Sequence, residues 1–103
     1  VALARALATN ADVLIAIEPT SAVDSHTEAR IASRLRSRRQ QLTTGLVTSS
    51  PLVLEQCDEV VFIGEDGKEV ARGSHDELLD RALRREESGL KYQKVVQRAQ
   101  GGE

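Results

Sequence analysis

The sequence predicts an α/β fold, and three observations support that prediction. Val13 to Ile17 is an unbroken run of five apolar residues rich in β-branched types, which indicates a strand buried on both faces, as in a parallel sheet. A helical pattern follows, and then a second strand-like run, Thr43 to Thr48. Further along, Asp66-Gly67 separates two strand-like runs and indicates a hairpin. Strands that alternate with helices are typical of a mostly parallel sheet with flanking helices.

The first half of the chain is expected to contain two helices and two strands. Val1 to Ala8 is Ala-rich and helical in pattern, with Asn10 as its C-terminal cap. The strand at 12–17 ends at Glu18 because Pro19 cannot donate to a sheet, and a loop runs from 18 to 24. Ser25-His26-Thr27-Glu28 has the sequence of a capping box and predicts a helix to about residue 40. Its apolar stripe comprises Ala29, Ile31, Ala32 and Leu35, and its solvated face comprises Arg30, Arg34, Arg36, Arg38 and Arg39.

The second half is expected to contain a hairpin and three helices. Pro51 suits the first position of a short helix at 51–57. Strands at 59–63 and 68–72 flank a two-residue turn at Asp66-Gly67. Ser74 to Glu77 is a second capping box, which opens a helix through Leu83. After a charged hinge at 84–89, the last helix carries a narrow apolar stripe made of Tyr92, Val95, Val96 and Ala99, which we expect to dock onto its own domain.

Composition excludes several classes of protein. The chain has 103 residues, 40% hydrophobic and 29% charged, as in an ordinary globular domain. A net charge of −2 gives no general attraction to nucleic acid or anionic lipid, and a single cysteine excludes a disulfide framework. No apolar run approaches the roughly 20 residues of a membrane span. Because there is no methionine and Val1 begins inside a helical pattern, we expect a piece of a longer polypeptide.

The stretch from Val13 to Asp24 resembles the Walker B strand and D-loop of the ABC-transporter ATPases. The usual form of that motif is four apolar residues followed by Asp-Glu-Pro-Thr-Ser-Ala-Leu-Asp. Thr44 to Pro51 lies where the family has its switch histidine, and Asp58 to Leu79 resembles the family's last hairpin and helix. The tail from Tyr92 to Gln97 is typical of exporter-type subunits. The resemblance covers nearly the whole chain, and it implies the C-terminal part of a P-loop NTPase (RecA-like) sheet.

By this resemblance, Glu18 is the catalytic carboxylate that orients the attacking water. Two other positions depart from the family's pattern. Ile17 stands where an aspartate holds Mg²⁺, and Ser49 stands where a histidine contacts the γ-phosphate. Ser21 to Asp24 corresponds to the D-loop at the dimer interface, and Asp24 or Ser25 also suits a helix cap. We therefore expect slow or absent hydrolysis at a degenerate site with no metal ligand of its own.

The resemblance also implies cofactors, partners and a location for the parent protein. The parent would bind ATP and Mg²⁺, pair with a second nucleotide-binding domain, attach to a transmembrane domain, and lie at the cytoplasmic face of the plasma membrane. Residues 1–84 would belong to the nucleotide-binding domain, and residues 85–103 would form a C-terminal helical tail. In that family's sheet the P-loop strand lies between the 44–48 and 59–63 strands. The chain alone is therefore expected to have a gap in its sheet, poor stability and no ATP binding.

The sequence leaves two rival functions open and disfavours three other kinds of site. The rivals are a non-catalytic interaction partner of a competent ABC subunit and an inactive gene remnant. Ser21, Asp24 and His26 lack the surroundings of a nucleophile, and their spacing suits capping. His26 and His75 lack partners at metal-ligand spacing. With one Phe and one Tyr in the chain, the arginines at 30–39 indicate a solvated face rather than a nucleic-acid site.

Overall fold

The computed structural model describes residues 11–20 and 22–101, and the chain divides into two compact units, residues 1–48 and 49–103. The described elements follow the predicted α/β order. The helix expected at 1–8, its cap Asn10, and Ser21 lie outside the described residues. Among the described helices, none is long and apolar enough to cross a membrane.

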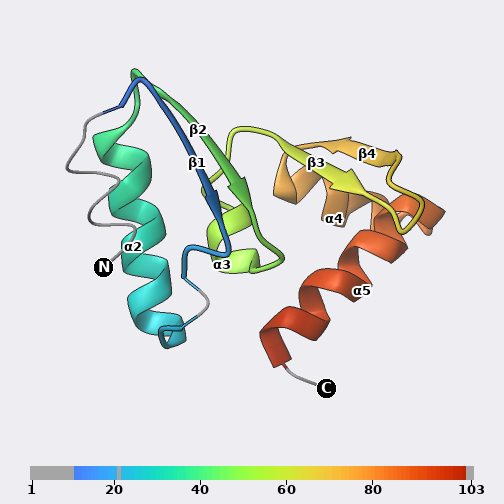
Figure 1. Cartoon of the computed structure of the whole chain (residues 1–103). Coiled ribbons are helices and arrows are strands. Elements are labelled where there is room, and N and C mark those ends of the chain that lie inside the picture. The colour runs from blue at the N-terminus through green and yellow to red at the C-terminus, as the bar shows by residue number, and fades with distance from the viewer. Residues whose placement is uncertain (1–10, 21, 102–103) are drawn as a thin grey trace. The chain divides into compact units, whose positions relative to one another are not determined.

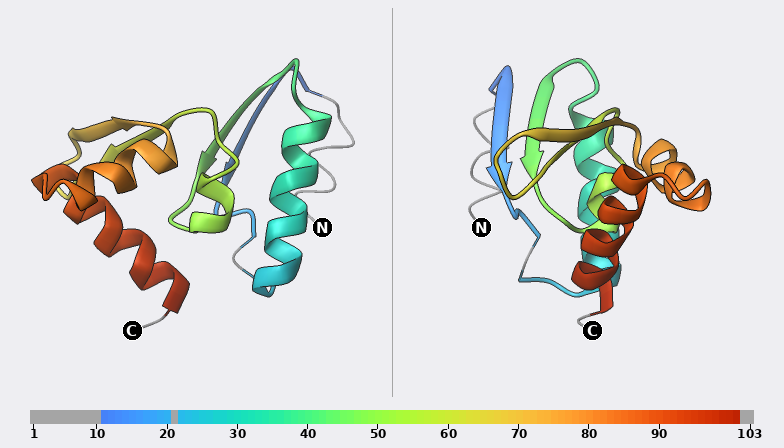
Figure 2. Two further views of the ribbon diagram at one scale, coloured as in Figure 1. Left: turned by 180° about the vertical axis from the view of Figure 1, so that it is seen from behind. Right: turned by 90° about the vertical axis from the view of Figure 1, so that its right-hand side faces the viewer.

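The first unit is built on a parallel pair of strands joined by a helix (Figure 1). Strand β1 (Val13–Ile17) pairs with β2 (Thr43–Val47) in a register that sets Val13 opposite Thr43 and Ile17 opposite Val47. Helix α2 (Ser25–Arg38) connects them and lies beside the pair in both views of Figure 2. The predicted parallel pairing is confirmed, with both strands ending at the same edge.

The prediction that β1 is buried on both faces is wrong for this structure. Val13, Ile15 and Ile17 are 58%, 72% and 74% exposed, whereas Leu14 is only 8% exposed. The sheet has two strands, and no described element of the same unit covers the face that these three side chains share. The apolar run therefore predicts a strand whose two faces can both be buried, and in this structure only the face that carries Leu14 is covered.

Helix α2 begins one residue earlier than the predicted capping box implies. Asp24 is the N-cap, and its Oδ1 accepts a 2.8 Å hydrogen bond from the backbone N–H of Thr27, so Ser25 is the first helical residue. Glu28 does not close a box on Ser25, because its carboxylate instead accepts a hydrogen bond from the hydroxyl of Thr20. Of the two caps that the sequence allowed, the structure selects Asp24.

Arg39 was expected on the solvated face of the helix, and that prediction is wrong. Its side chain is 6% exposed and lies where α2 turns back into β2. Nε donates to Oγ1 of Thr44 at 2.7 Å, and one terminal nitrogen donates to the backbone oxygens of Thr43 at 3.0 Å and Asp12 at 3.5 Å. The guanidinium thus satisfies backbone carbonyls beside the first residues of both strands, which is how a buried charge is tolerated.

The second unit contains a hairpin and three helices. Helix α3 (Pro51–Leu54) is shorter than the 51–57 predicted, and strands β3 (Val60–Ile63) and β4 (Glu69–Gly73) form the expected antiparallel hairpin. The predicted two-residue turn is wrong. Gly64 and Lys68 close the loop through a 2.9 Å bond, and Gly67 alone adopts a positive φ, +81°, in place of the two positive values that a two-residue turn of type I′ needs.

Helices α4 (His75–Leu83) and α5 (Glu87–Gly101) complete this unit. The capping box at α4 is confirmed, because Ser74 and Glu77 exchange both side-chain bonds. The predicted hinge is shorter than expected, since α5 already begins at Glu87. The stripe on α5 docks on its own unit through two of its four predicted members. Tyr92 and Val96 join a core with Leu54, Val60, Ala71 and Leu78. Val95 is instead exposed, and the side chain of Ala99 lies outside the described residues.

Candidate functional site

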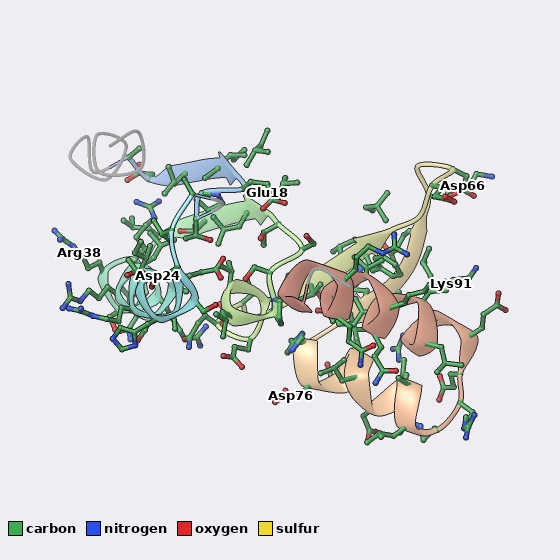
Figure 3. All side chains as sticks on the ribbon, turned by 90° about the horizontal axis from the view of Figure 1, so that it is seen from below. Glu18, Asp24, Arg38, Asp66, Asp76 and Lys91 are labelled. Atoms are coloured by element: carbon green, nitrogen blue, oxygen red, sulfur yellow. The ribbon has the colours of Figure 1, made fainter. Side chains whose placement is uncertain are left out.

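The candidate site is the β1–α2 loop, residues 18–24, at the carboxyl end of β1. In Figure 3, Glu18 lies at the tip of that strand and Asp24 at the beginning of α2. In open α/β sheets this edge is where ligands bind, because loops from neighbouring parallel strands meet there.

Ile17 is the last residue of β1, and its side chain is exposed. Its backbone pairs with Val47, so the strand forms as it would with any residue at that position. The side chain carries no oxygen and cannot ligate Mg²⁺, directly or through water. Within residues 11–20 and 22–101, no group of three or more acidic, His or Cys side chains could hold a metal ion. The described residues therefore do not fit a magnesium site.

Glu18 has an exposed carboxylate on a fixed backbone. Its φ is +46°, in the left-handed region that residues with a Cβ rarely adopt, and its N–H donates to the carbonyl of Val47 at 2.7 Å. The hydroxyl of Thr48 donates to Glu18 Oε2 at 3.5 Å, a long bond. The first residue after β1 is thereby tied to the last residue of β2 and to Thr48, which follows it, and its carboxylate is exposed to solvent.

Asp24 closes the loop as the cap of α2, and the same bond has an electrostatic effect. The backbone N–H of Thr27 lowers the pKa of Asp24, because it favours the charged carboxylate. Ser49 is half-buried and is the first residue of the unit 49–103. Ser21 lies outside the described residues. The structure thus brings together Glu18 and Thr48 and sets Asp24 at the other end of the same loop.

Two interactions escaped the sequence analysis. Thr20 is buried at 4% exposure and donates a 2.5 Å hydrogen bond to Glu28 Oε2. In the second unit, buried His75 and Tyr92 are joined by a 2.7 Å bond between Nδ1 and Oη, and burial raises the pKa of Tyr92. His75 also borders a half-open groove of about 290 Å³ whose apolar walls are Leu52, Leu79 and Val96. No sequence signal distinguishes these residues from ordinary helix and loop residues.

Comparison with known proteins relates the chain to export ATPases. No family model matches it. A β-(1→2)-glucan export ATP-binding/permease protein of Rhizobium johnstonii is 38% identical over 78 residues, 76% of this chain and 13% of that protein. An ATP-dependent lipid A-core flippase of Haemophilus ducreyi is 40% identical over 78 residues, again 76% and 13%. The mitochondrial ABC transporter B family member 24 of Arabidopsis thaliana is 40% identical over 84 residues, 82% of this chain and 12% of that protein. The chain is related to ABC exporter ATPase domains, and it spans about an eighth of the length of these relatives.

Proposed function

We propose that this chain is the C-terminal part of the ATP-binding domain of an ABC exporter, whose parent couples ATP binding and hydrolysis to transmembrane export. The observation that carries the proposal is the relatedness to ATP-binding/permease proteins over about three quarters of the chain. A parallel β1–β2 pair that ends in a carboxylate supports it, because phosphoryl transfer needs such a group at the carboxyl edge of the sheet.

In this proposal Glu18 orients the attacking water. Its carboxylate is exposed and can accept a hydrogen bond from a water at this edge. The bond to Val47 fixes the backbone from which that carboxylate extends. Ile17 replaces the aspartate that contacts Mg²⁺ in the family and provides no such contact. Ser49 replaces the family's histidine, and its hydroxyl is shorter and carries no charge. The site is therefore degenerate: hydrolysis is slow or absent although the water-orienting group is present. Residues 21–24, from Ser21 to Asp24, form the D-loop that faces a second copy or a partner domain.

The remaining assignments follow from the parent. It binds ATP and Mg²⁺, pairs with a second nucleotide-binding domain, and attaches to a transmembrane domain at the cytoplasmic face of the plasma membrane. Residues 1–84 belong to the nucleotide-binding domain and residues 85–103 form its helical tail. The Gly-rich loop and lysine that cradle phosphates are not part of these 103 residues, so the chain alone binds no cofactor.

The test is to restore the two altered side chains in the full-length protein, Ile17→Asp with Ser49→His, and to measure ATP turnover. We expect a gain of roughly tenfold to a hundredfold, because the metal contact stabilises charge that develops at the transferred phosphate. The matched control is Ile15→Asp, which places the same side chain on the same exposed face two residues earlier. Adding Glu18→Gln to the restored protein should abolish the gain.

A second candidate function is a non-catalytic partner that pairs with a competent ABC subunit. The observation that favours it is Ile17, which removes a metal contact without disturbing the pairing of β1 with β2. If the full-length protein binds no ATP before or after restoration but still assembles with a second ATPase subunit, the degenerate-site proposal is wrong and the partner function stands.

A further inference from the structure

Thr20 is a buried polar side chain in the β1–α2 loop. It keeps 4% of its surface, whereas Glu18 and Asp24 on either side of it are exposed. Its hydroxyl donates to Oε2 of Glu28, in the first turn of α2, at 2.5 Å. A hydroxyl donating to a carboxylate makes one of the stronger side-chain hydrogen bonds, and burial strengthens it further.

This bond lies between two other anchors of the β1–α2 loop. The loop begins with the bond from the N–H of Glu18 to Val47 and ends with the cap that Asp24 places on Thr27. Between them, the carbonyl of Thr20 accepts a 3.3 Å bond from the N–H of Val23. Thr20 thus attaches the middle of the loop to the helix through its side chain, and its backbone carbonyl closes the loop on Val23.

The attachment acts on a backbone that needs support. Glu18 has a positive φ of +46°, and the proline that follows it further narrows the conformations open to it. Such a conformation persists where the surroundings over-determine it. On one side of Glu18 the support is β2, and on the other it is Thr20 with its bond to Glu28.

We propose that Thr20 is the positioning residue of this site: its hydroxyl, bound to Glu28, fixes the loop and so sets where the Glu18 carboxylate and the residues near Asp24 meet the nucleotide. This inference rests on the proposed function for its link to ATP. The attachment itself concerns only this chain. Thr20 acts through Glu18 and touches no reacting atom.

The attachment is tested by hydrogen exchange on the 103-residue chain, with no nucleotide present. Thr20→Val keeps the shape of the side chain and removes the donor, and we expect the amides of Glu18 and Val23 to exchange on the order of 10- to 100-fold faster. Thr20→Ser keeps the hydroxyl and should restore slow exchange. Amides within β2 should keep their rates, because their bonds to β1 do not involve the loop.

Two further variants separate positioning from a general loss of packing. Thr43→Val makes the same substitution at an exposed threonine of β2 and should leave the loop amides unchanged. Glu28→Ala should reproduce the faster exchange of Thr20→Val. Combining the two substitutions should add little, because each removes the same hydrogen bond between Thr20 and Glu28. If Thr20→Val leaves the exchange of Glu18 and Val23 unchanged, or if Thr20→Ser fails to restore it, the attachment proposal is overturned.

The link to the nucleotide is tested in the full-length transporter that carries Ile17→Asp with Ser49→His, the variant in which we expect measurable turnover. There Thr20→Val should lower kcat for ATP severalfold with little change in KM, and Thr20→Ser should recover it, because a displaced Glu18 orients water poorly without altering nucleotide affinity. Faster loop exchange with unchanged kcat overturns the role in turnover. Absence of ATP binding by the unsubstituted full-length protein overturns the proposed function instead, and the exchange result then still decides whether Thr20 holds the loop.

Discussion

Gly89, in the first turn of α5, is where the backbone of that helix passes very close to α4. A Cβ atom built on Gly89 would lie 2.3 Å from the backbone nitrogen of Ala82, 2.5 Å from the carbonyl carbon of Arg81 and 2.6 Å from Arg81 Cβ. Real Cβ atoms almost never approach other heavy atoms within 3.0 Å. Because two of these three atoms belong to the backbone, no side-chain rotation relieves the overlap, and α5 must move.

Gly89→Ala therefore sets two effects of opposite sign against each other. Helix propensity favours alanine over glycine by about 1 kcal/mol. Overpacking costs about 1–3 kcal/mol, and contacts this short to backbone belong at the upper end of that range. Moving α5 also disturbs Tyr92 and Val96, which belong to the core of this unit. We expect a net loss of about 2 kcal/mol in the free energy of unfolding.

Urea unfolding followed by tyrosine fluorescence measures this loss in the right unit. The chain has one tyrosine and no tryptophan, so the signal reports on Tyr92 alone. Lys94→Ala is the control in the same helix: the side chain of Lys94 is exposed, so the substitution creates no overlap and stability should change little. If Gly89→Ala is as stable as the unsubstituted chain or more so, the close packing of α4 and α5 described here is refuted.

Two further predictions concern buried and capping hydrogen bonds. Tyr92→Phe removes the hydrogen-bond partner of His75 Nδ1 and should lower the free energy of unfolding, measured by circular dichroism, by about 1–3 kcal/mol. Adding His75→Leu should recover part of this loss. Additive effects of the two substitutions would show that the pair is not coupled. The bond that Glu77 accepts from the backbone N–H of Ser74 lowers the pKa of Glu77, so its stabilisation is present above its ordinary value of 4.5 and is lost as the pH falls below that. Glu77→Gln should therefore flatten the fall in unfolding midpoint in acid, and an equally steep fall in the variant would contradict the cap assignment.

Local patterns were sufficient to predict most elements of the fold. The apolar run at 13–17 predicted β1, the glycine after Asp66 predicted the hairpin, and the capping box at Ser74 predicted the start of α4. These signals are local: a strand run, a turn residue and a cap each involve residues within about four positions of one another. Relatedness to export ATPases, also inferred from such motifs, is confirmed by the comparisons.

Apart from the turn at Asp66-Gly67, the predictions that are wrong concern burial and side-chain partners, which depend on how separate elements pack together. Arginines 38 and 39 look alike in sequence, yet Arg39 is buried and bonds to residues of both strand starts because the chain turns there. Likewise the sequence predicted that Glu28 closes a capping box on Ser25, whereas in the fold its carboxylate accepts a hydrogen bond from Thr20, eight residues away. The exposed face of β1 is a third case, because an apolar run reports what a strand can bury and not what covers it.

The candidate site shows why a change at Ile17 alters chemistry more than structure. The loop is held by the backbone of Glu18 on β2, by Thr20 on Glu28 and by Asp24 on the first turn of α2. None of these bonds involves the side chain at position 17, which is 74% exposed. Ile17→Asp therefore introduces a carboxylate that stays hydrated and loses at most about 1 kcal/mol of strand propensity. A change in turnover on Ile17→Asp can thus be assigned to metal chemistry, because the unfolding midpoints of the variant and of the unsubstituted protein should agree closely.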